Sequence, residues 1–310
     1  MNKEENIILT SLYKDCMLIR FSGSRIVIER CPDQALGRPC VIRVSDSSGS
    51  VVLENKGVLS LPFSFYLPYA SDGLYTLTVS YLPHDKQSYC HTVNSFNGFP
   101  FQIINGESIR CIPDTLQENR RIYEGLSESF FKKHRSSLVP YTAFIPEPVI
   151  QCAHHIVKRA YSNYDKILAV HDWVADNIHY DYDSLHDRSF QSAPIDAMSI
   201  LKKRRTVCCG YSALAVSLLR AVGVMAINMD CFALSSSTHG GWRNSRNMSE
   251  PANHVVTFAY ADDRWVMMDT TWDSNKEYRN GKFLTKPHPL SHMYFDSTLA
   301  FFSFTHRFIL

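Results

Sequence analysis

The sequence predicts an α+β protein in which an all-β N-terminal region precedes a region of helices followed by an antiparallel sheet. Three observations indicate this order. Short segments rich in β-branched and aromatic residues lie between residues 17 and 104, helical patterns replace them from about residue 148, and strand-like segments return after residue 224. The length of 310 residues is that of about two ordinary domains.

The N-terminal region contains several short segments with the residue preferences and period-two alternation of strands. Turn-forming residues separate them, for example at 22–24 and 71–73. Short strands with frequent turns and no long helical pattern are typical of an immunoglobulin-like β-sandwich, which we expect over residues 1–110. The expected strands are residues 17–21, 25–29, 41–44, 74–81 and 99–104.

Residues 111–147 are expected to form a connector between two domains. Thr115-Leu-Gln-Glu118 has the pattern of a capping box and predicts the start of a short helix. Three prolines then interrupt the chain, at Pro140, Pro146 and Pro148. The second domain is therefore expected to occupy residues 148–310.

Four helices are expected in the first half of the second domain. Their residues are 149–160, 165–178, 195–202 and 206–223. The last segment is apolar around most of its circumference until Gly223 ends it. A helix that is apolar on all sides is buried, so this segment predicts the central helix of the domain.

Strands are expected next, at residues 225–231, 254–260 and 264–270. The last two form a hairpin that turns at Asp262-Asp263. If the turn has an even number of residues, Ala261 faces Arg264, and His254 and Asp269 share one face of the sheet as diagonal neighbours. An odd-membered loop would place them on opposite faces.

Composition and charge exclude several classes of protein. Hydrophobic residues make up 45% and charged residues 20% of the chain, unlike a disordered protein. The net charge of +2 provides no strong field for nucleic acid or an anionic membrane. We expect no membrane insertion and a cytoplasmic location, because neither a secretory signal peptide nor an apolar run of about 20 residues is seen.

The nine cysteines are odd in number and irregularly spaced, and none forms a Cys-x-x-Cys pair. A disulfide scaffold and a zinc ribbon are therefore not expected. Two histidine pairs, His154-His155 and His288/His292, lack carboxylates or thiolates at ligand spacing nearby. We expect no metal and no cofactor.

The start of the expected central helix carries the candidate nucleophile. Cys208 and Cys209 both lie where the positive end of the helix dipole favours a thiolate, although most free cysteines are simply buried. With His254 as base and Asp269 as its orienting group, the order is that of a Cys-His-Asp triad. Alternatively, the Asp269 carboxylate caps the turn that follows it.

Three segments resemble the motifs of the transglutaminase-like superfamily, which read Val-Cys-x-Gly-Tyr, His-(Ala/Val)-Trp and Trp-x-x-(Val/Leu)-Asp-(Thr/Pro)-Thr-Trp-Asp. They are Val207-Cys208-Cys209-Gly210-Tyr211, Asn253-His254-Val255 and Trp265 to Asp273. The resemblance covers about residues 160–275. It implies a papain-like α+β core, a transglutaminase-like catalytic domain over residues 148–310, and catalytic Cys208, His254 and Asp269. Cys209 falls at the variable position of the first motif.

The chain departs from the pattern at two places. Many relatives have Gly at the position of Thr206, and many have Trp after the His-(Ala/Val) dipeptide, where this chain has Val255-Val256. Neither position supplies triad chemistry. In this superfamily an upstream side chain often helps the backbone N–H of the Cys to bind the oxyanion. The candidates here are Tyr180, Tyr182 and Gln191, and the Tyr-Asp pair at Tyr180 resembles that of the family.

The resemblance implies cysteine-dependent acyl transfer on protein or peptide amides through a thioester. We favour hydrolysis, by a peptidase or amidase, and expect a protein or peptide substrate. Transglutaminase cross-linking, deamidation and a catalytically idle scaffold remain alternatives. The sequence leaves the oligomeric state open.

Overall fold

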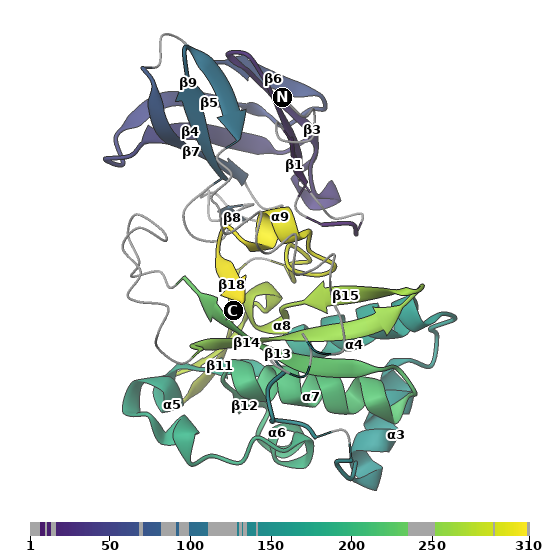
Figure 1. Cartoon of the computed structure of the whole chain (residues 1–310). Coiled ribbons are helices and arrows are strands. Elements are labelled where there is room, and N and C mark those ends of the chain that lie inside the picture. The colour runs from purple at the N-terminus through teal and green to yellow at the C-terminus, as the bar shows by residue number, and fades with distance from the viewer. Residues whose placement is uncertain are drawn as a thin grey trace. The chain divides into compact units, whose positions relative to one another are not determined.

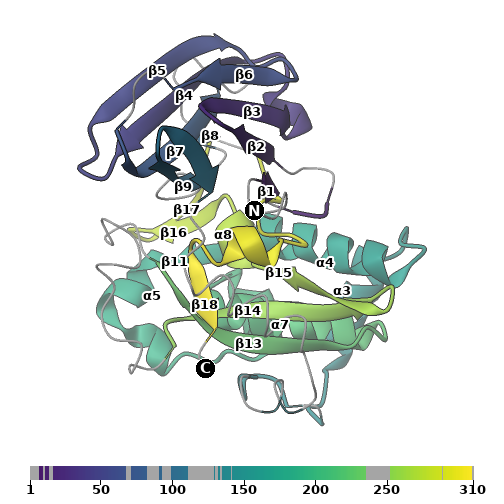
Figure 2. The ribbon, with the colours of Figure 1, turned by 45° about the horizontal axis from the view of Figure 1, so that its top comes forward.

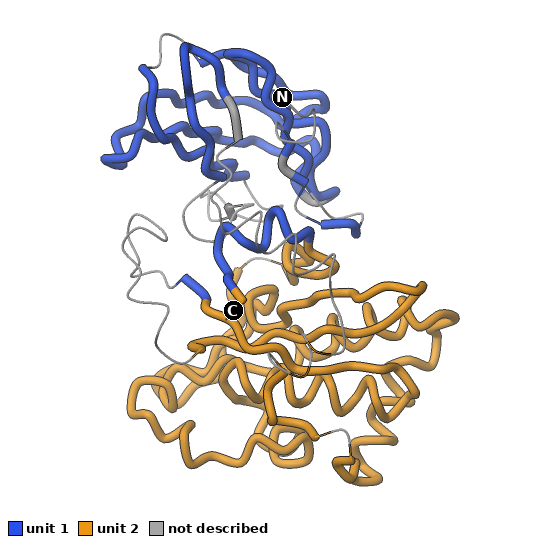
Figure 3. Tube along the Cα trace, in the orientation of Figure 1, with its two compact units in different colours: residues 1–125, 233–247, 298–307 blue, residues 126–232, 248–297, 308–310 orange. Residues whose placement is uncertain are grey.

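The computed structural model describes residues 7–9, 11–13, 17–67, 71–81, 91–92, 99–110, 129, 132, 135–140, 142–234, 252–287 and 289–308. The short helix expected from residue 115 lies outside this set. The chain divides into two compact units (Figure 3). Unit 1 comprises residues 1–125, 233–247 and 298–307, and unit 2 comprises residues 126–232, 248–297 and 308–310.

Unit 1 contains two antiparallel sheets (Figure 1, Figure 2). One has the order β1 (Ile7–Leu9), β2 (Leu18–Ser22), β3 (Arg25–Arg30), β6 (Phe63–Tyr66). The other has the order β10 (Glu107–Arg110), β9 (Phe99–Ile104), β7 (Gly73–Tyr81), β4 (Pro39–Asp46), β5 (Val51–Val58), and β8 (His91–Thr92) pairs with β7. The expected all-β region is confirmed, and the five expected strands correspond to β2, β3, β4, β7 and β9.

Alternating side chains form the core of unit 1. In β2 and β3 the buried residues are Ile19, Phe21, Ile26 and Ile28, and the Phe21 ring lies 5.2 Å from that of Phe101. The unit also includes α9 (Leu299–Phe302), near the end of the chain. There the Phe301 ring lies 6.0 Å from that of Phe99.

Unit 2 begins with helices. The four expected ones appear as α3 (Glu147–Ile156), α4 (Asn163–Asn177), α6 (Ala197–Lys203) and α7 (Cys208–Ala221), joined by α5 (Tyr182–Asp187) and η3 (Ser189–Gln191). A capping box between Ser162 and Asp165 begins α4. Every residue of α7 from Gly210 to Leu219 is buried, so the expectation of a buried central helix is confirmed.

The main antiparallel sheet of unit 2 contains β13 (Ala226–Ala233), β14 (His254–Ala261) and β15 (Arg264–Met268), with β14 in the middle and against α7 (Figure 1). A smaller sheet has the order β12 (Arg205–Thr206), β11 (His179–Asp181), β16 (Lys276–Arg279), β17 (Lys282–Thr285). The last strand that the structure describes is β18 (His306–Phe308). The expected order of helices followed by an antiparallel sheet is confirmed.

The β14–β15 hairpin has the expected even-membered turn. Ala261 pairs with Arg264, and the register continues to Thr257 and Met268. Asp262 and Asp263 have φ values of 51° and 57°, as a two-residue type I′ turn requires. The expected strand is nevertheless too long: β15 ends at Met268 rather than residue 270, because the next residue caps the helix α8 (Thr270–Asp273).

None of the helices that the structure describes is long and apolar enough to cross a membrane.

Candidate functional site

Cys208 is the first residue of α7 and is half-buried. The backbone approaches closely here, because a Cβ atom on Gly210 would lie 2.0 Å from Thr206 Oγ1 and 2.7 Å from Thr206 Cβ. Thr206, one of the departures from the family motif, therefore fills the space beside Gly210. Only glycine fits at position 210 while Thr206 is present.

Two side chains of α7, a few residues after Cys208, connect the helix to β14 and to the residue before β11. The buried Ser212 Oγ lies 3.0 Å from the Val256 carbonyl and 2.8 Å from Thr257 Oγ1, both in β14. The Tyr211 hydroxyl donates a hydrogen bond to the carbonyl of Ile178, which immediately precedes β11. The N-terminus of α7 is thus connected both to the strand that begins at His254 and to the strand that carries Tyr180.

His254 and Asp269 meet as the hairpin register predicts. His254 Nε2 lies 2.7 Å from Asp269 Oδ2, and the side chains are only 6% and 1% exposed. The other oxygen, Asp269 Oδ1, accepts hydrogen bonds from the N–H groups of Thr271 (3.0 Å) and Trp272 (3.1 Å). The two interpretations of Asp269, contact with His254 and helix cap, are therefore both realised, by different oxygens.

The electrostatics of His254 favour an imidazolium. Burial lowers its pKa, but the negative charge of Asp269 and hydrogen bonds with Asp269 and Cys208 outweigh burial and raise the pKa to about 10. Because one ring nitrogen is held by Asp269, the other is left for exchange of a proton with the thiol.

The two adjacent cysteines differ in environment. Burial, together with the nearby Cys208, raises the pKa of Cys209 to about 11. A thiol with such a raised pKa is rarely a thiolate near neutral pH. Of the two cysteines, Cys208 is the one whose side-chain hydrogen bond contributes to the raised pKa of His254.

Of the three oxyanion candidates, Tyr180 lies near Cys208. Burial raises the pKa of its hydroxyl strongly, and the neighbouring Cys208 adds to the effect, so this group remains a protonated O–H donor. Its ring lies 4.9 Å from that of Tyr182. The Tyr182 ring is itself covered by the Arg279 guanidinium at 4.2 Å, and Gln191 lies in η3.

No sequence pattern predicted the groups that hold the Asp269 turn. The Asp269 N–H donates to the Tyr294 carbonyl at 3.0 Å, and the Tyr294 N–H donates to the Asp273 carboxylate at 3.1 Å. The Trp272 ring lies 6.0 Å from that of His254. Trp272 and Asp273 belong to the quoted motif, but no local pattern connects Tyr294 to it.

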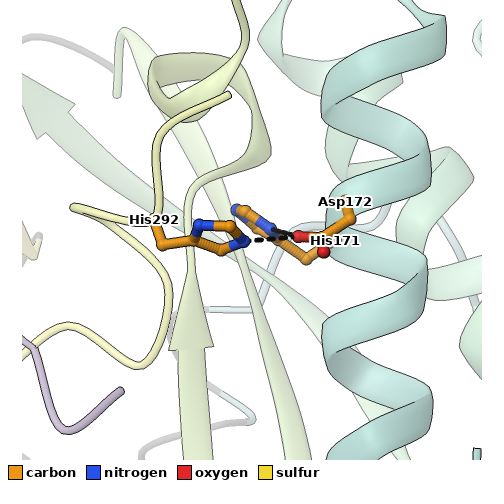
Figure 4. Close-up of side chains that lie close together, drawn as sticks. All are labelled: His171, Asp172 and His292. Carbon is orange, nitrogen blue, oxygen red and sulfur yellow. Dashed lines mark hydrogen bonds and ion pairs between the residues drawn. The ribbon is translucent and has the colours of Figure 1, made fainter. Parts of the chain in front are cut away.

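Two histidine pairs were noted in the sequence. His154 and His155 are exposed on α3, and His288 lies outside the described residues. His292 instead lies beside His171 and Asp172 of α4 (Figure 4).

Residues 150–270, which contain Cys208, His254 and Asp269, match the model of the transglutaminase-like superfamily. This part of the chain resembles that superfamily. The resemblance inferred from the three motifs is thereby confirmed.

Similar proteins include the kyphoscoliosis peptidases of Mus musculus and Homo sapiens. The mouse protein is 26% identical over 120 residues, which cover 38% of this chain and 17% of the mouse protein. The human protein is 26% identical over 121 residues, with the same coverage of 38% and 17%. The chain therefore matches under a fifth of the length of these curated relatives.

Solved structures with some similarity include a candidate cysteine protease from Cytophaga hutchinsonii, at 17% identity and a TM-score of 0.32, with 81% of this chain and 67% of that chain covered. The periplasmic domain of TgpA from Pseudomonas aeruginosa is 11% identical with a TM-score of 0.30, and the coverage is 88% and 84%.

Proposed function

We propose that this chain catalyses cysteine-dependent acyl transfer on protein or peptide amides, with hydrolysis as the outcome. The observation that carries the proposal is the buried His254–Asp269 contact of 2.7 Å beside the N-terminus of α7, where Cys208 shares a hydrogen bond with His254. Cys208 is the nucleophile, His254 the general base and acid, and Asp269 the residue that orients the imidazole.

In the first half-reaction the Cys208 thiolate attacks the amide carbonyl carbon and forms a C–S bond. The C–N bond then breaks, and the leaving amine takes a proton from the His254 imidazolium. In the second half-reaction His254 removes a proton from water, which attacks the thioester. The C–S bond breaks, which releases a carboxylic acid and returns the Cys208 thiolate.

The tetrahedral intermediates carry a negative oxygen that needs fixed donors. The backbone N–H of Cys208 lies at a helix N-terminus, where the dipole also favours negative charge. Tyr180 is the side-chain donor that we propose, because its hydroxyl stays protonated near Cys208.

The name peptidase of the mouse and human relatives favours water as the second nucleophile. A lysine amine in place of water would give cross-linking, and release of ammonia from a glutamine side chain followed by attack of water on the γ-glutamyl thioester would give deamidation. Incubation with a peptide library and an amine acceptor, followed by mass spectrometry, distinguishes cleaved, deamidated and amine-modified products. A catalytically idle scaffold would give none of them.

The assignment of the nucleophile is tested with Cys208→Ala and Cys209→Ala. Successive helix residues point about 100° apart, so only one thiol faces His254. We expect Cys208→Ala to abolish turnover and Cys209→Ala to retain most of it. Comparable losses in two folded variants would contradict the assignment.

A further inference from the structure

Two histidines and an aspartate from two distant parts of the chain lie close together in unit 2. Asp172 Oδ1 lies 2.9 Å from His171 Nδ1 and 2.7 Å from His292 Nε2 (Figure 4). His171 and Asp172 are neighbours on α4, whereas His292 lies in the segment after β17. One nitrogen from each imidazole and one carboxylate oxygen thus lie within 4.8 Å of one another.

We propose that His171, Asp172 and His292 form a binding site for a divalent transition-metal ion of the zinc type. The ligands are His171 Nδ1, His292 Nε2 and an oxygen of Asp172. Imidazole nitrogen suits zinc and its neighbours better than calcium or magnesium, which prefer all-oxygen sites. Three protein ligands leave a fourth position for water.

The spacing of the ligand atoms is compatible with such an ion. At metal–ligand distances of about 2.0–2.2 Å, two ligands of a tetrahedral ion lie roughly 3.3 Å apart. The contacts of 2.9 and 2.7 Å therefore need to open by about 0.5 Å. Asp172 is free to make this movement, because its side chain is 40% exposed, and the same exposure gives the ion a route from solvent.

A second carboxylate supports the buried ligand. His171 is fully buried, and its Nε2 lies 3.0 Å from Asp273 Oδ2. Histidine ligands commonly donate their other ring N–H to a carboxylate, which fixes the tautomer and leaves the opposite nitrogen for the metal. The Phe295 ring packs 4.9 Å from the His171 ring and 6.2 Å from the His292 ring, so both imidazoles have a fixed apolar neighbour.

The ion would have a structural role. It would join α4 to the segment that carries His292, and through His171 it would support Asp273. The Asp273 N–H donates to the Asp269 carbonyl at 3.1 Å, within the turn that holds the carboxylate beside His254. No step of the proposed reaction passes through the metal.

The test is binding of Zn²⁺ to the purified 310-residue chain, measured by equilibrium dialysis, together with the absorption spectrum of the Co²⁺ form. We expect one equivalent of tightly bound ion with nitrogen and oxygen ligands. His292→Ala and Asp172→Asn should each weaken binding by about 10–100-fold or more. The Asp172 side chain is 40% exposed, and asparagine keeps an acceptor oxygen, so we expect Asp172→Asn to fold. This variant therefore decides the question even if His292→Ala does not fold.

Two controls separate this site from other metal-binding groups. His154→Ala with His155→Ala removes two exposed imidazoles outside the cluster and should leave binding unchanged. Cys208→Ala should also bind the ion with unchanged affinity. Its Co²⁺ absorption spectrum should have the same bands as that of the wild type. Absence of stoichiometric binding would overturn the proposal. So would an affinity that depends on Cys208, or on His154 and His155, but not on Asp172. His171, Asp172 and His292 would then form only a hydrogen-bonded network.

Discussion

The two oxygens of Asp269 have separate contacts, and this separation determines what each substitution at that residue should do. Oδ2 lies against His254 Nε2, whereas Oδ1 caps α8 through Thr271 and Trp272. An asparagine can keep the cap, because its carbonyl oxygen remains an acceptor. It cannot also present an anionic acceptor to the imidazole.

We therefore predict that Asp269→Asn keeps the fold and lowers kcat/KM by about 10²–10⁴-fold. Asp269→Ala should show the same kinetic loss and, in addition, destabilise the protein by about 1 kcal/mol through loss of the cap. Steady-state kinetics and urea unfolding of both variants measure the two effects. Unchanged kcat/KM in folded Asp269→Asn would remove Asp269 from the catalytic group and leave a Cys-His dyad.

The raised pKa of His254 predicts a pH dependence of stability. The pKa rises from 6.5 to about 10 in the folded protein, so the folded state binds the proton more tightly than the unfolded state. The stabilisation is fully present below pH 6.5 and is lost as the pH rises through about 10. Urea unfolding of the wild type and of His254→Gln should show a free-energy difference that shrinks over this range. A difference that stays constant from neutral pH to pH 10 would contradict the imidazolium.

At the scale of elements, the β12–α7 junction depends on a small residue. Gly210→Ala places a Cβ 2.0 Å from Thr206 Oγ1, with the Thr206 Cβ only 2.7 Å away. We expect overpacking to destabilise the protein by about 1–3 kcal/mol and to displace Cys208.

The double variant Thr206→Gly with Gly210→Ala removes the opposing atoms and should recover much of that loss. The coupling energy from a double-mutant cycle, measured by thermal or urea unfolding, checks this prediction. Purely additive effects would show that the close approach between the two residues is not the cause.

Much of unit 2 could be predicted from local patterns in the sequence. The period of α7, the even-membered turn at Asp262-Asp263 and the side-chain alternation in the hairpin were sufficient to bring His254 and Asp269 together. The end of β15 was missed, because the same Asp269 that contacts His254 also caps α8. The small sheet was missed as well, since β11 and β12 have only three and two residues and show no alternation.

The contacts around the site escaped prediction for a different reason. Asp172 and His292 are 120 residues apart, and Tyr294 lies beyond the last motif. Each of these contacts depends on where a later segment packs, and no spacing within one element encodes it. Tyr180 could be favoured only through the resemblance.

At the scale of the whole molecule, the N-terminal unit includes a segment from near the other end of the chain. Residues 298–307 belong to unit 1, where Phe301 packs against Phe99 and Thr298 Oγ1 donates to the Leu9 carbonyl. The boundaries expected from the sequence, a sandwich over 1–110 and a catalytic domain over 148–310, remain predictions.

We predict that a fragment of residues 111–310 folds with one cooperative urea transition. In the whole chain Phe301 is 1% exposed and packs against Phe99, which the fragment lacks. Phe301→Ser should therefore make the fragment more soluble but destabilise the full chain, by about 3 kcal/mol or more. A broad, non-cooperative transition of the fragment, with or without the substitution, would show that the domain boundary is wrong.

The central claim, that His254 and Asp269 make Cys208 a nucleophile, is tested most directly by the rate of alkylation of each cysteine. The folded protein is treated with iodoacetamide near neutral pH, and peptide mapping by mass spectrometry follows the individual thiols. Cys208 should react at least about 10-fold faster than Cys209 and Cys152, and His254→Gln should remove the difference. Equal, slow labelling of all three thiols in the wild type, or fast labelling of Cys208 that survives His254→Gln, would contradict the claim.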